Sequence, residues 1–288
     1  MSILLNSNSK IIVQGITGRD GSFHAQRMKQ YGTQVVGGVT PGKGGQDVAG
    51  IPVFHTVEQA VARTGANVSV IFVPARFAAD AVCEAAAHGI KLIVAVSEGI
   101  PTQDMARVLP FVKERGARLI GPNSPGLIVP GIGSVGIFPY TIVTPGSVGV
   151  ISRSGTLTYE LIHHLTAAGI GQSCCVGVGG DQIIGMRFTD YLELFERDDQ
   201  TRAVVMIGEI GGTDEQDAAR YIREHLSKPV VGFIAGKTAP PGKRMGHAGA
   251  IISGGDATAF AKVQILEANG IHVINEPEEI GQAISSVI

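Results

Sequence analysis

One histidine, His247, lies among small residues in the segment Lys243–Ala250, shortly after a run that reads as a buried strand. The neighbouring glycines let a ligand approach the backbone closely. A neutral imidazole in such a place can act as a nucleophile, a general base or a metal ligand. The alternative is a histidine that only hydrogen-bonds locally, and the remainder of the chain must decide between these roles.

Glycine-rich ends follow four predicted strands in the second half of the chain, at residues 152–156, 177–181, 208–212 and 236–249. Packing alone rarely requires so many glycines, and ligands in open α/β sheets bind beyond the carboxyl ends of the strands. Glu209 is predicted at the tip of one strand and His247 in the loop that leaves the next. A carboxylate that accepts a hydrogen bond from one ring nitrogen fixes the tautomer and leaves the other nitrogen free to attack.

A candidate phosphate site lies nearby in the sequence, at Ser154, Gly155 and Thr156, just before a predicted helix at residues 159–168. The free N–H groups and the positive dipole end of a helix N-terminus hold anions. A histidine, an orienting carboxylate and an anion site together indicate phosphoryl transfer through a phosphohistidine. The alternative is a set of structural turns around a histidine whose hydrogen bonds are satisfied locally.

Two other kinds of site fit the histidine less well. A metal site needs more ligands, and neither H-E-x-x-H nor a cysteine pair surrounds His247, so no metal site is predicted. A serine hydrolase needs G-x-S-x-G, whereas the segment Ser152–Gly155 lacks the leading glycine.

The elements that must position these residues follow an α/β pattern. The chain has 288 residues, 44% of them apolar and 17% charged, with 40 glycines, which is typical of a globular α/β protein of about two domains. Apolar spacings of three and four predict helices at residues 77–88 and 103–115. Short apolar runs predict strands at residues 10–14, 34–39, 68–73, 91–96, 148–152, 173–176, 203–207 and 230–234.

The strand and helix pattern is interrupted at residues 122–146, where proline, glycine and asparagine recur in turn-forming pairs. We expect a connection between domains in that segment. The sequence thus predicts a Rossmann-like domain at residues 1–124 and a flavodoxin-like α/β domain at residues 125–288.

The first domain offers its own ligand site. Strand one leads into a G-x-x-G-x-x-G turn at Gly15–Gly21, which could seat a phosphate or form a plain tight turn. The second strand is followed by Lys43, where an NAD-binding unit would have an acidic residue. A lysine there favours a phosphorylated ribose, as in NADP or coenzyme A, unless it is only a solvated turn residue. The segments 74–76 and 96–99 follow the next strands and could line the same crevice.

Composition argues against several classes of partner and location. The formal net charge is -2 without a run of lysine and arginine, so neither nucleic acid nor a membrane surface is expected as a partner. No apolar run approaches the roughly 20 residues of a membrane span, and the N-terminus lacks a signal pattern, so we expect a cytoplasmic protein. Cys83, Cys174 and Cys175 are expected to be core residues and not a disulfide framework.

Four motifs closely resemble the signatures of the alpha-subunit family of succinyl-CoA synthetase, also called succinate–CoA ligase, and the similarity extends over essentially the whole chain. The motifs are Gly37–Gly45 (GGVTPGKGG), Ser152–Glu160 (SRSGTLTYE), Ile207–Gly212 (IGEIGG) and Arg244–Ile252 (RMGHAGAII).

The resemblance implies a role for each matching residue. It implies that His247 carries the phosphoryl group, that Glu209 supports it and that Tyr159 helps to bind the organic acid. It also implies that coenzyme A contacts the first domain at Thr17, Gly18, Arg19, Asp20, Lys43, Val96, Ser97 and Glu98.

The implied reaction is reversible: succinate, coenzyme A and ATP or GTP give succinyl-CoA, nucleoside diphosphate and phosphate through an acyl phosphate, as in the tricarboxylic acid cycle. In the family an ATP-grasp beta subunit supplies the nucleotide site and its magnesium, in an αβ or α2β2 assembly, so this chain should be inactive alone. Ser124 replaces a cysteine that is usual in the family, and the segments 139–142 and 180–182 also depart from it. These departures concern the acid and not the reaction type, so a ligase for malate or another polycarboxylate stays open. A non-catalytic CoA-binding module and an NADP-dependent oxidoreductase are separate alternatives.

Overall fold

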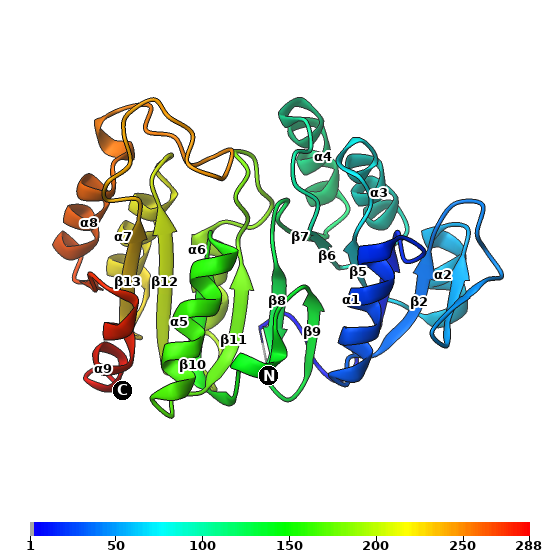
Figure 1. The fold of residues 1–288 in the computed structure, drawn as a ribbon, viewed down its shortest axis with the longest axis horizontal. Helices are drawn as coiled ribbons and strands as arrows, with labels where there is room; N and C mark the ends of the chain where they lie inside the picture. Colours follow the sequence, from blue (N-terminus) through cyan, green and yellow to red (C-terminus); the bar gives the residue numbers. More distant parts are fainter. Residues whose placement is uncertain (1–2) are drawn as a thin grey trace.

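The computed structural model describes residues 3–288 and contains two seven-stranded sheets that lie side by side along the long axis of the molecule (Figure 1). The α/β class and the order of the two domains agree with the prediction from the sequence. Every strand predicted from the apolar runs is present, with ends that differ from the expected ones by at most three residues.

The first sheet has the strand order β3-β4-β2-β1-β5-β6-β7, and only the β3–β4 pair is antiparallel. From β1 the chain first adds strands toward one edge of the sheet and then, from β5 on, toward the other edge. Ligands bind at this switch point in sheets of this kind. The strands are β1 (Ile11–Gln14), β2 (Val35–Val39), β3 (Asp47–Val48), β4 (Ile51–Phe54), β5 (Val68–Ile71), β6 (Leu92–Ala95) and β7 (Arg118–Ile120).

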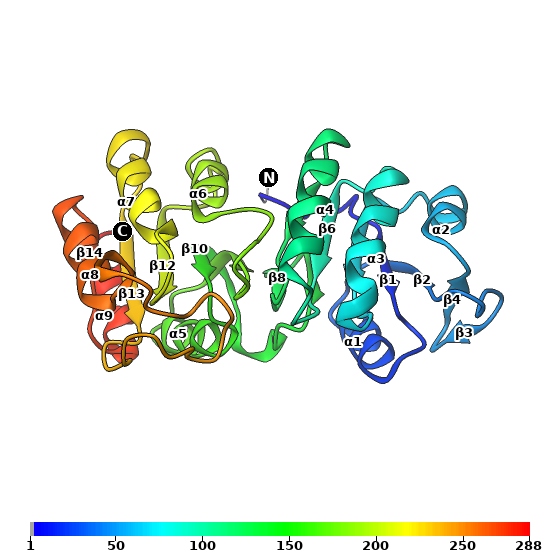
Figure 2. The same ribbon diagram turned by 90° about the horizontal axis from the view of Figure 1, so that it is seen from above.

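Helices cover both faces of the first sheet (Figure 2). Alternate residues of each buried strand face opposite sides, so Ile12 packs with α2, α3 and α4, whereas Ile11 and Val13 pack with α1. The helices are α1 (Arg19–Gln30), α2 (Val57–Thr64), α3 (Ala75–Ala87) and α4 (Thr102–Glu114). The helices predicted at residues 77–88 and 103–115 correspond to α3 and α4.

The second sheet has the order β14-β13-β12-β10-β11-β8-β9, with β8 antiparallel to both of its neighbours and the other pairs parallel. Its strands are β8 (Gly126–Val129), β9 (Gly133–Gly136), β10 (Pro145–Ser152), β11 (Gln172–Gly177), β12 (Ala203–Glu209), β13 (Val230–Ala235) and β14 (His272–Val273).

Five helices cover the second sheet. Apolar residues of α5 and α9 pack on one face, and those of α6, α7 and α8 pack on the other. These helices are α5 (Gly155–Ala167), α6 (Phe188–Glu196), α7 (Asp214–His225), α8 (Ala259–Ala268) and α9 (Ile280–Ser285), with 3-10 turns at Tyr140–Ile142, Gly255–Ala257 and Pro277–Glu279.

The expectation that residues 122–146 form only a connection is wrong. The segment holds the β8–β9 hairpin, and β8 pairs with β11 as part of the second sheet. The turn residues that suggested a linker lie between and beside these short strands. A division at residues 124 and 125 stays a proposal; it falls between β7 and β8.

The hairpin also attaches the two sheets to each other. The hydroxyl of Thr33, after α1, donates to the carbonyl of Ser134 in β9 at 3.0 Å and accepts from the Ser134 N–H at 2.9 Å. A second attachment comes from Gly185 and Met186, whose N–H groups donate to carbonyls beside and within β7 at 2.8 Å each. One continuous apolar core therefore contains residues of both sheets, among them Val13 and Val176.

Candidate active site

His247 and Glu209 lie together above the carboxyl ends of the second sheet. Glu209 is the last residue of β12, and His247 lies in the loop 236–258, which arches over the sheet and is orange at the top of Figure 1. The Nδ1 atom of His247 is 3.0 Å from Oε1 and 2.9 Å from Oε2 of Glu209. The two side chains, which the strand ends predicted to lie near each other, are thus close enough to form a hydrogen bond.

The surroundings of this pair leave one ring nitrogen available. The side chain of Glu209 is 9% exposed, whereas that of His247 is 25% exposed. The hydrogen bond to Glu209 raises the pKa of His247, although burial and the positive charge of Arg153 oppose the rise. Nε2 makes no hydrogen bond within residues 3–288, so it is the nitrogen that a reactant can reach.

A buried ion pair holds the backbone of Glu209. Lys262 and Glu215 are fully buried and bonded to each other, and Nζ of Lys262 also donates to the carbonyls of Glu209 at 2.8 Å and Gly211 at 2.6 Å. Oε1 of Glu215 accepts the N–H of Glu209 at 3.2 Å. Burial lowers the pKa of Lys262, and the charge of Glu215 opposes that change. Both polar groups of the Glu209 peptide are therefore fixed from inside the protein.

Neither Lys262 nor Glu215 is among the site residues predicted from the sequence. Lys262 interrupts an otherwise mainly apolar helix, α8, and Glu215 stands six residues after Glu209. A lysine is almost never fully buried unless it is paired. Its place in an apolar helix was the signal that could have identified it.

Gly180 forms the wall against which the imidazole packs. A Cβ atom on Gly180 would lie 2.4 Å from Cγ of His247, which no real contact allows. The carbonyl of Gly180 accepts the N–H of Gly249 at 3.0 Å, so the same residue also anchors the histidine loop. A glycine at this strand end is thus required by the close approach of the histidine.

The predicted phosphate seat lies beside the pair, although only part of it lines the cavity. A cavity of about 280 Å³ is lined by Ser154, Glu209 and His247 together with Leu157, Ile210, Ala235, Gly236, Met245, Gly246 and Ala250. Ser154 caps α5, because its side chain accepts the N–H of Leu157 at 3.3 Å. The next two amides, of Gly155 and Thr156, have no hydrogen-bond partner among the described residues and can hold an anion.

Tyr159 does not line this cavity. It lies further along α5, where its ring meets Phe138 edge-on at 5.6 Å between centroids. Burial raises the pKa of its hydroxyl to about 12, so it is a neutral donor at physiological pH. Its contact with the organic acid stays a prediction.

A second cavity lies at the carboxyl ends of β1, β5 and β6 in the first domain. It has a volume of about 360 Å³ and is lined by Asp20, Phe72, Val73, Pro74, Ala75, Val96, Ser97 and Glu98. Four residues predicted to bind coenzyme A line it, namely Asp20, Val96, Ser97 and Glu98. The turn before α1 depends on glycine, since a Cβ on Gly21 would lie 2.2 Å from the carbonyl oxygen of Gly15.

The other four predicted residues lie outside that cavity. Thr17, Gly18 and Arg19 belong to the turn and first residue of α1, and the hydroxyl of Thr17 donates to that of Thr40 at 3.2 Å. Lys43 is exposed in the turn after β2, and its N–H donates to the carbonyl of Thr40 at 3.0 Å. Thr40 thus connects the turn before α1 to Lys43, the residue predicted to hold a ribose phosphate.

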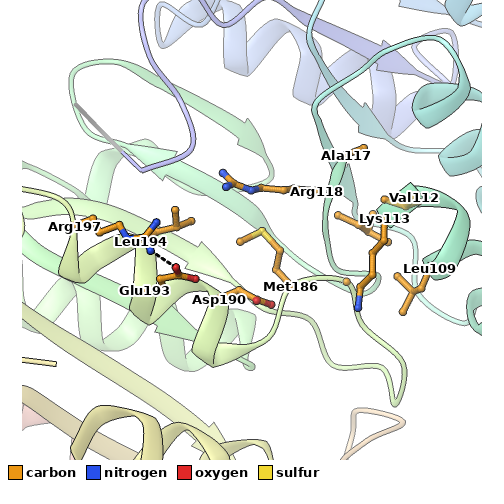
Figure 3. A pocket seen from close by; sticks show the side chains of 12 residues that line it. Leu109, Val112, Lys113, Ala117, Arg118, Met186, Asp190, Glu193, Leu194 and Arg197 are labelled. Atoms are coloured by element: carbon orange, nitrogen blue, oxygen red, sulfur yellow. Dashed lines mark hydrogen bonds and ion pairs between the residues drawn. The ribbon is translucent and has the colours of Figure 1, made fainter. Parts of the chain in front are cut away.

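A third cavity, of about 240 Å³, contains none of the predicted site residues (Figure 3). It lies between the end of α4, β7 and α6, with Lys113 and Arg118 of the first domain on one side and the Glu193–Arg197 ion pair of the second domain on the other. Its position at the amino end of β7 separates it from both sites at the carboxyl ends.

The structure also bears on metals, cysteines and membranes. Within residues 3–288 no group of three histidine, cysteine or acidic side chains could hold a metal ion. Cys174 and Cys175 are buried and Cys83 is partly buried, all three as free thiols, as expected from the sequence. No helix in the described part of the chain is long and apolar enough to cross a membrane.

Comparison with known proteins identifies two domains in the chain. Residues 6–99 match the CoA binding domain family, and residues 151–272 match the CoA-ligase family. Among solved structures, ATP citrate lyase from Methanothrix soehngenii in complex with citrate and coenzyme A has the same fold, with a TM-score of 0.91 and 24% identity over 99% of this chain. The chain spans 50% of the length of that lyase chain.

Curated relatives match over full length. Subunit alpha of the ADP-forming succinate–CoA ligase of Aquifex aeolicus is 56% identical over 290 aligned residues, which cover 100% of this chain and 95% of the relative. Subunit alpha 2 of the same ligase in Archaeoglobus fulgidus is 57% identical over 288 residues, 100% of both chains. The chain belongs to the family of succinate–CoA ligase alpha subunits.

Proposed function

We propose that this chain is the alpha subunit of an ADP-forming succinate–CoA ligase and that it carries a phosphoryl group on His247. The observation that supports this most directly is the hydrogen bond from Nδ1 of His247 to both carboxylate oxygens of Glu209, in a cavity beside the N-terminus of α5. The names of the relatives support succinate as the acid and ADP as the nucleotide product.

In this mechanism Glu209 accepts a hydrogen bond from Nδ1–H of the neutral imidazole, which keeps the proton on Nδ1 and leaves the Nε2 lone pair free to attack a phosphoryl group. The positive charge that develops on the imidazole is stabilised by the carboxylate. The free amides of Gly155 and Thr156 and the dipole of α5 stabilise the negative charge of the phosphoryl group. Lys262 and Glu215 keep the peptide of Glu209 in place during the transfer.

The later steps use the organic acid and coenzyme A. A carboxylate oxygen of succinate attacks the phosphorus, the N–P bond breaks, and succinyl phosphate forms with a neutral His247. The thiol of coenzyme A then attacks the acyl carbon and releases phosphate. We place coenzyme A in the first-domain cavity next to Asp20, Val96, Ser97 and Glu98, with Thr17, Gly18, Arg19 and Lys43 holding its phosphates.

A partner chain completes the enzyme in this proposal. The relatives are named as alpha subunits, which supports a beta subunit. We assign the nucleotide and its magnesium ion to an ATP-grasp beta subunit, and the complex to the cytoplasm as an αβ or α2β2 assembly.

The test is the intact mass of the chain, co-purified with its beta subunit and incubated with ATP and magnesium under non-acidic conditions that preserve phosphohistidine. We expect one added phosphoryl group, absent from His247→Ala and discharged by succinate with coenzyme A. Discharge by malate and not by succinate would show that malate is the acid substrate. Binding of coenzyme A without any added mass would support a non-catalytic module and overturn the proposal.

A further inference from the structure

Asp181 lies between the first-domain cavity proposed for coenzyme A and the loop that carries His247. It lies in the loop after β11, next to Gly180, against which the imidazole of His247 packs. Asp181 is 7% exposed. Its Oδ1 atom accepts a hydrogen bond from the side-chain amide of Asn123 at 3.2 Å. The carboxylate is therefore buried, oriented and next to the histidine loop.

Asn123 fixes Asp181 relative to both sides. Its N–H donates to the carbonyl of Ser97 at 3.0 Å, and Ser97 lines the first-domain cavity. Its own carbonyl accepts the N–H of Gly180 at 3.0 Å, and Gly180 lies against His247. Asn123 thus bonds to Ser97 in the proposed site of coenzyme A, to Gly180 beside His247 and to the carboxylate of Asp181.

A cavity of about 180 Å³ opens beside Asp181. Its lining includes Asp181 and Ala248, which is adjacent to His247, together with Glu98 and Arg244. Glu98 also lines the larger first-domain cavity, so the two cavities share a wall. A group that passes from the first-domain cavity toward the histidine loop therefore comes near Asp181.

The chemistry between these cavities requires a base. A thiol has an ordinary pKa of about 8.5 and is mostly protonated at neutral pH, whereas the thiolate is the nucleophile. Glu209 is engaged with His247, and the exposed carboxylate of Glu98 is paired with Arg244 at 3.7 Å. Asp20 lines only the first-domain cavity and is paired with Arg19 at 3.1 Å. Asp181 is therefore the remaining carboxylate in the lining of the 180 Å³ cavity.

We propose that Asp181 is the general base that takes the thiol proton of coenzyme A when the sulfur attacks succinyl phosphate. The S–C bond forms, the C–O bond to phosphate breaks, and the electron pair leaves with the phosphate. The proton goes to a carboxylate oxygen of Asp181, which later returns it to solvent. This inference rests on the proposed ligase function.

The electrostatic surroundings suit that role. Burial raises the pKa of Asp181 and the charge of Glu98 adds to the rise, whereas the hydrogen bond from Asn123 and the positive charges of His247 and Arg244 oppose it. A carboxylate of raised pKa accepts a proton from a thiol more readily than an ordinary one.

The experiment compares two nucleophiles in the αβ enzyme carrying Asp181→Asn. Hydroxylamine is uncharged at neutral pH and captures succinyl phosphate as a hydroxamate without a thiol proton to remove. We expect the variant to form the hydroxamate and phosphorylate His247 as the wild type does. The kcat for succinyl-CoA should fall about 100-fold or more, the usual contribution of a general base, with little change in the KM for coenzyme A. The remaining activity should rise with pH as more thiolate forms.

A matched control is Asp199→Asn, because Asp199 is an exposed carboxylate between α6 and β12, at the amino ends of the strands. Equal losses with both nucleophiles, an unchanged kcat with coenzyme A, or a loss confined to KM would each overturn the role of Asp181. If the wild-type enzyme formed neither phosphohistidine nor hydroxamate, the ligase function itself would fail.

A measurement on the wild type covers the case in which the variant does not fold. The pH dependence of the coenzyme A reaction should contain an acidic limb from a carboxyl group that the hydroxylamine reaction lacks. Identical profiles for the two nucleophiles would refute the proposal.

Discussion

The close approach of Gly180 to His247 gives a sharp test of the active-site geometry. In Gly180→Ala the new Cβ would lie 2.4 Å from Cγ, 2.5 Å from Cδ2 and 2.8 Å from Nδ1 of the imidazole. Ordinary van der Waals contacts begin at 3.4 Å. Since 3.4 minus 2.4 is 1.0 Å, the ring must move away by about 1 Å, and the backbone of Gly180 has no positive φ that would add strain of its own.

The consequence for catalysis should exceed that for stability. A displacement of about 1 Å moves Nδ1 out of the narrow range in which it bonds Glu209, and a misplacement of this size can cost about 100-fold in rate. Overpacking a site costs about 1–3 kcal/mol of unfolding free energy, and the partly exposed histidine loop can move, so we expect a loss near the lower end. The variant should therefore be folded yet slow to phosphorylate.

The assay is the rate of phosphoryl incorporation from ATP in the complex with the beta subunit, followed by intact mass, with urea unfolding in parallel. The control is Gly254→Ala, because Gly254 lies in the same loop with extended backbone and nothing within 4 Å of a Cβ. Phosphorylation of Gly180→Ala at the wild-type rate would show that the imidazole does not depend on this wall. A loss in Gly254→Ala as large as in Gly180→Ala would show that any change in the loop is harmful.

Three further predictions concern the groups around the site. The hydrogen bond to Glu209 raises the pKa of His247. The charged imidazole therefore stabilises the fold below pH 6.5, and this stabilisation is lost as the pH rises through the higher pKa of the folded state. Glu209→Gln should lower the pKa of His247 in an NMR titration, and an unchanged pKa would contradict the role of this hydrogen bond. Lys262→Met should reduce the free energy of unfolding by about 3 kcal/mol, the lower end for a broken buried pair, because the buried carboxylate of Glu215 then keeps only Arg153, whose Nε lies 4.0 Å away. Urea unfolding should show partial recovery in the double variant with Glu215→Gln, and equal losses would argue against the pair. In native protein, iodoacetamide should label Cys83 slowly and leave the two buried cysteines unmodified, since burial raises the pKa of all three thiols; mass analysis showing a buried thiol labelled first would refute this.

The parts of the site that could be predicted are those that strand ends determine. Glu209 and His247 follow adjacent parallel strands, β12 and β13, whose carboxyl ends lie at one edge of the sheet, so their proximity follows from the apolar runs and the glycines after them. A helix after Ser154 follows from the same pattern, although α5 begins at Gly155, four residues before the predicted start at residue 159. These predictions need only the direction of the strands, which parallel α/β topology supplies.

Other features depend on long-range contacts that no local pattern contains. The bond between Lys262 and Glu215 joins residues 47 positions apart, and it forms because α8, which carries Lys262, packs against α7, which carries Glu215. The β8–β9 hairpin was read as a linker because its strands are short and bounded by turn residues. Its identity as sheet comes from pairing with β11, whose partner residues lie almost 50 positions further along the chain.

The corrected role of the hairpin changes how the proposed reaction must proceed. Domains usually move relative to each other unless their interface is large and apolar. Here the hydrogen bonds between Thr33 and Ser134, the hydrogen bond from Gly185 N–H to the carbonyl of Gly121 and a shared apolar core hold the two sheets together. The separation between the first-domain cavity and His247 is then set by the fold. If coenzyme A binds in the first-domain cavity as proposed, its thiol has to extend past Asn123 and Asp181 to reach the acyl phosphate, and Asn123, which bonds to both sides, then lies on the route.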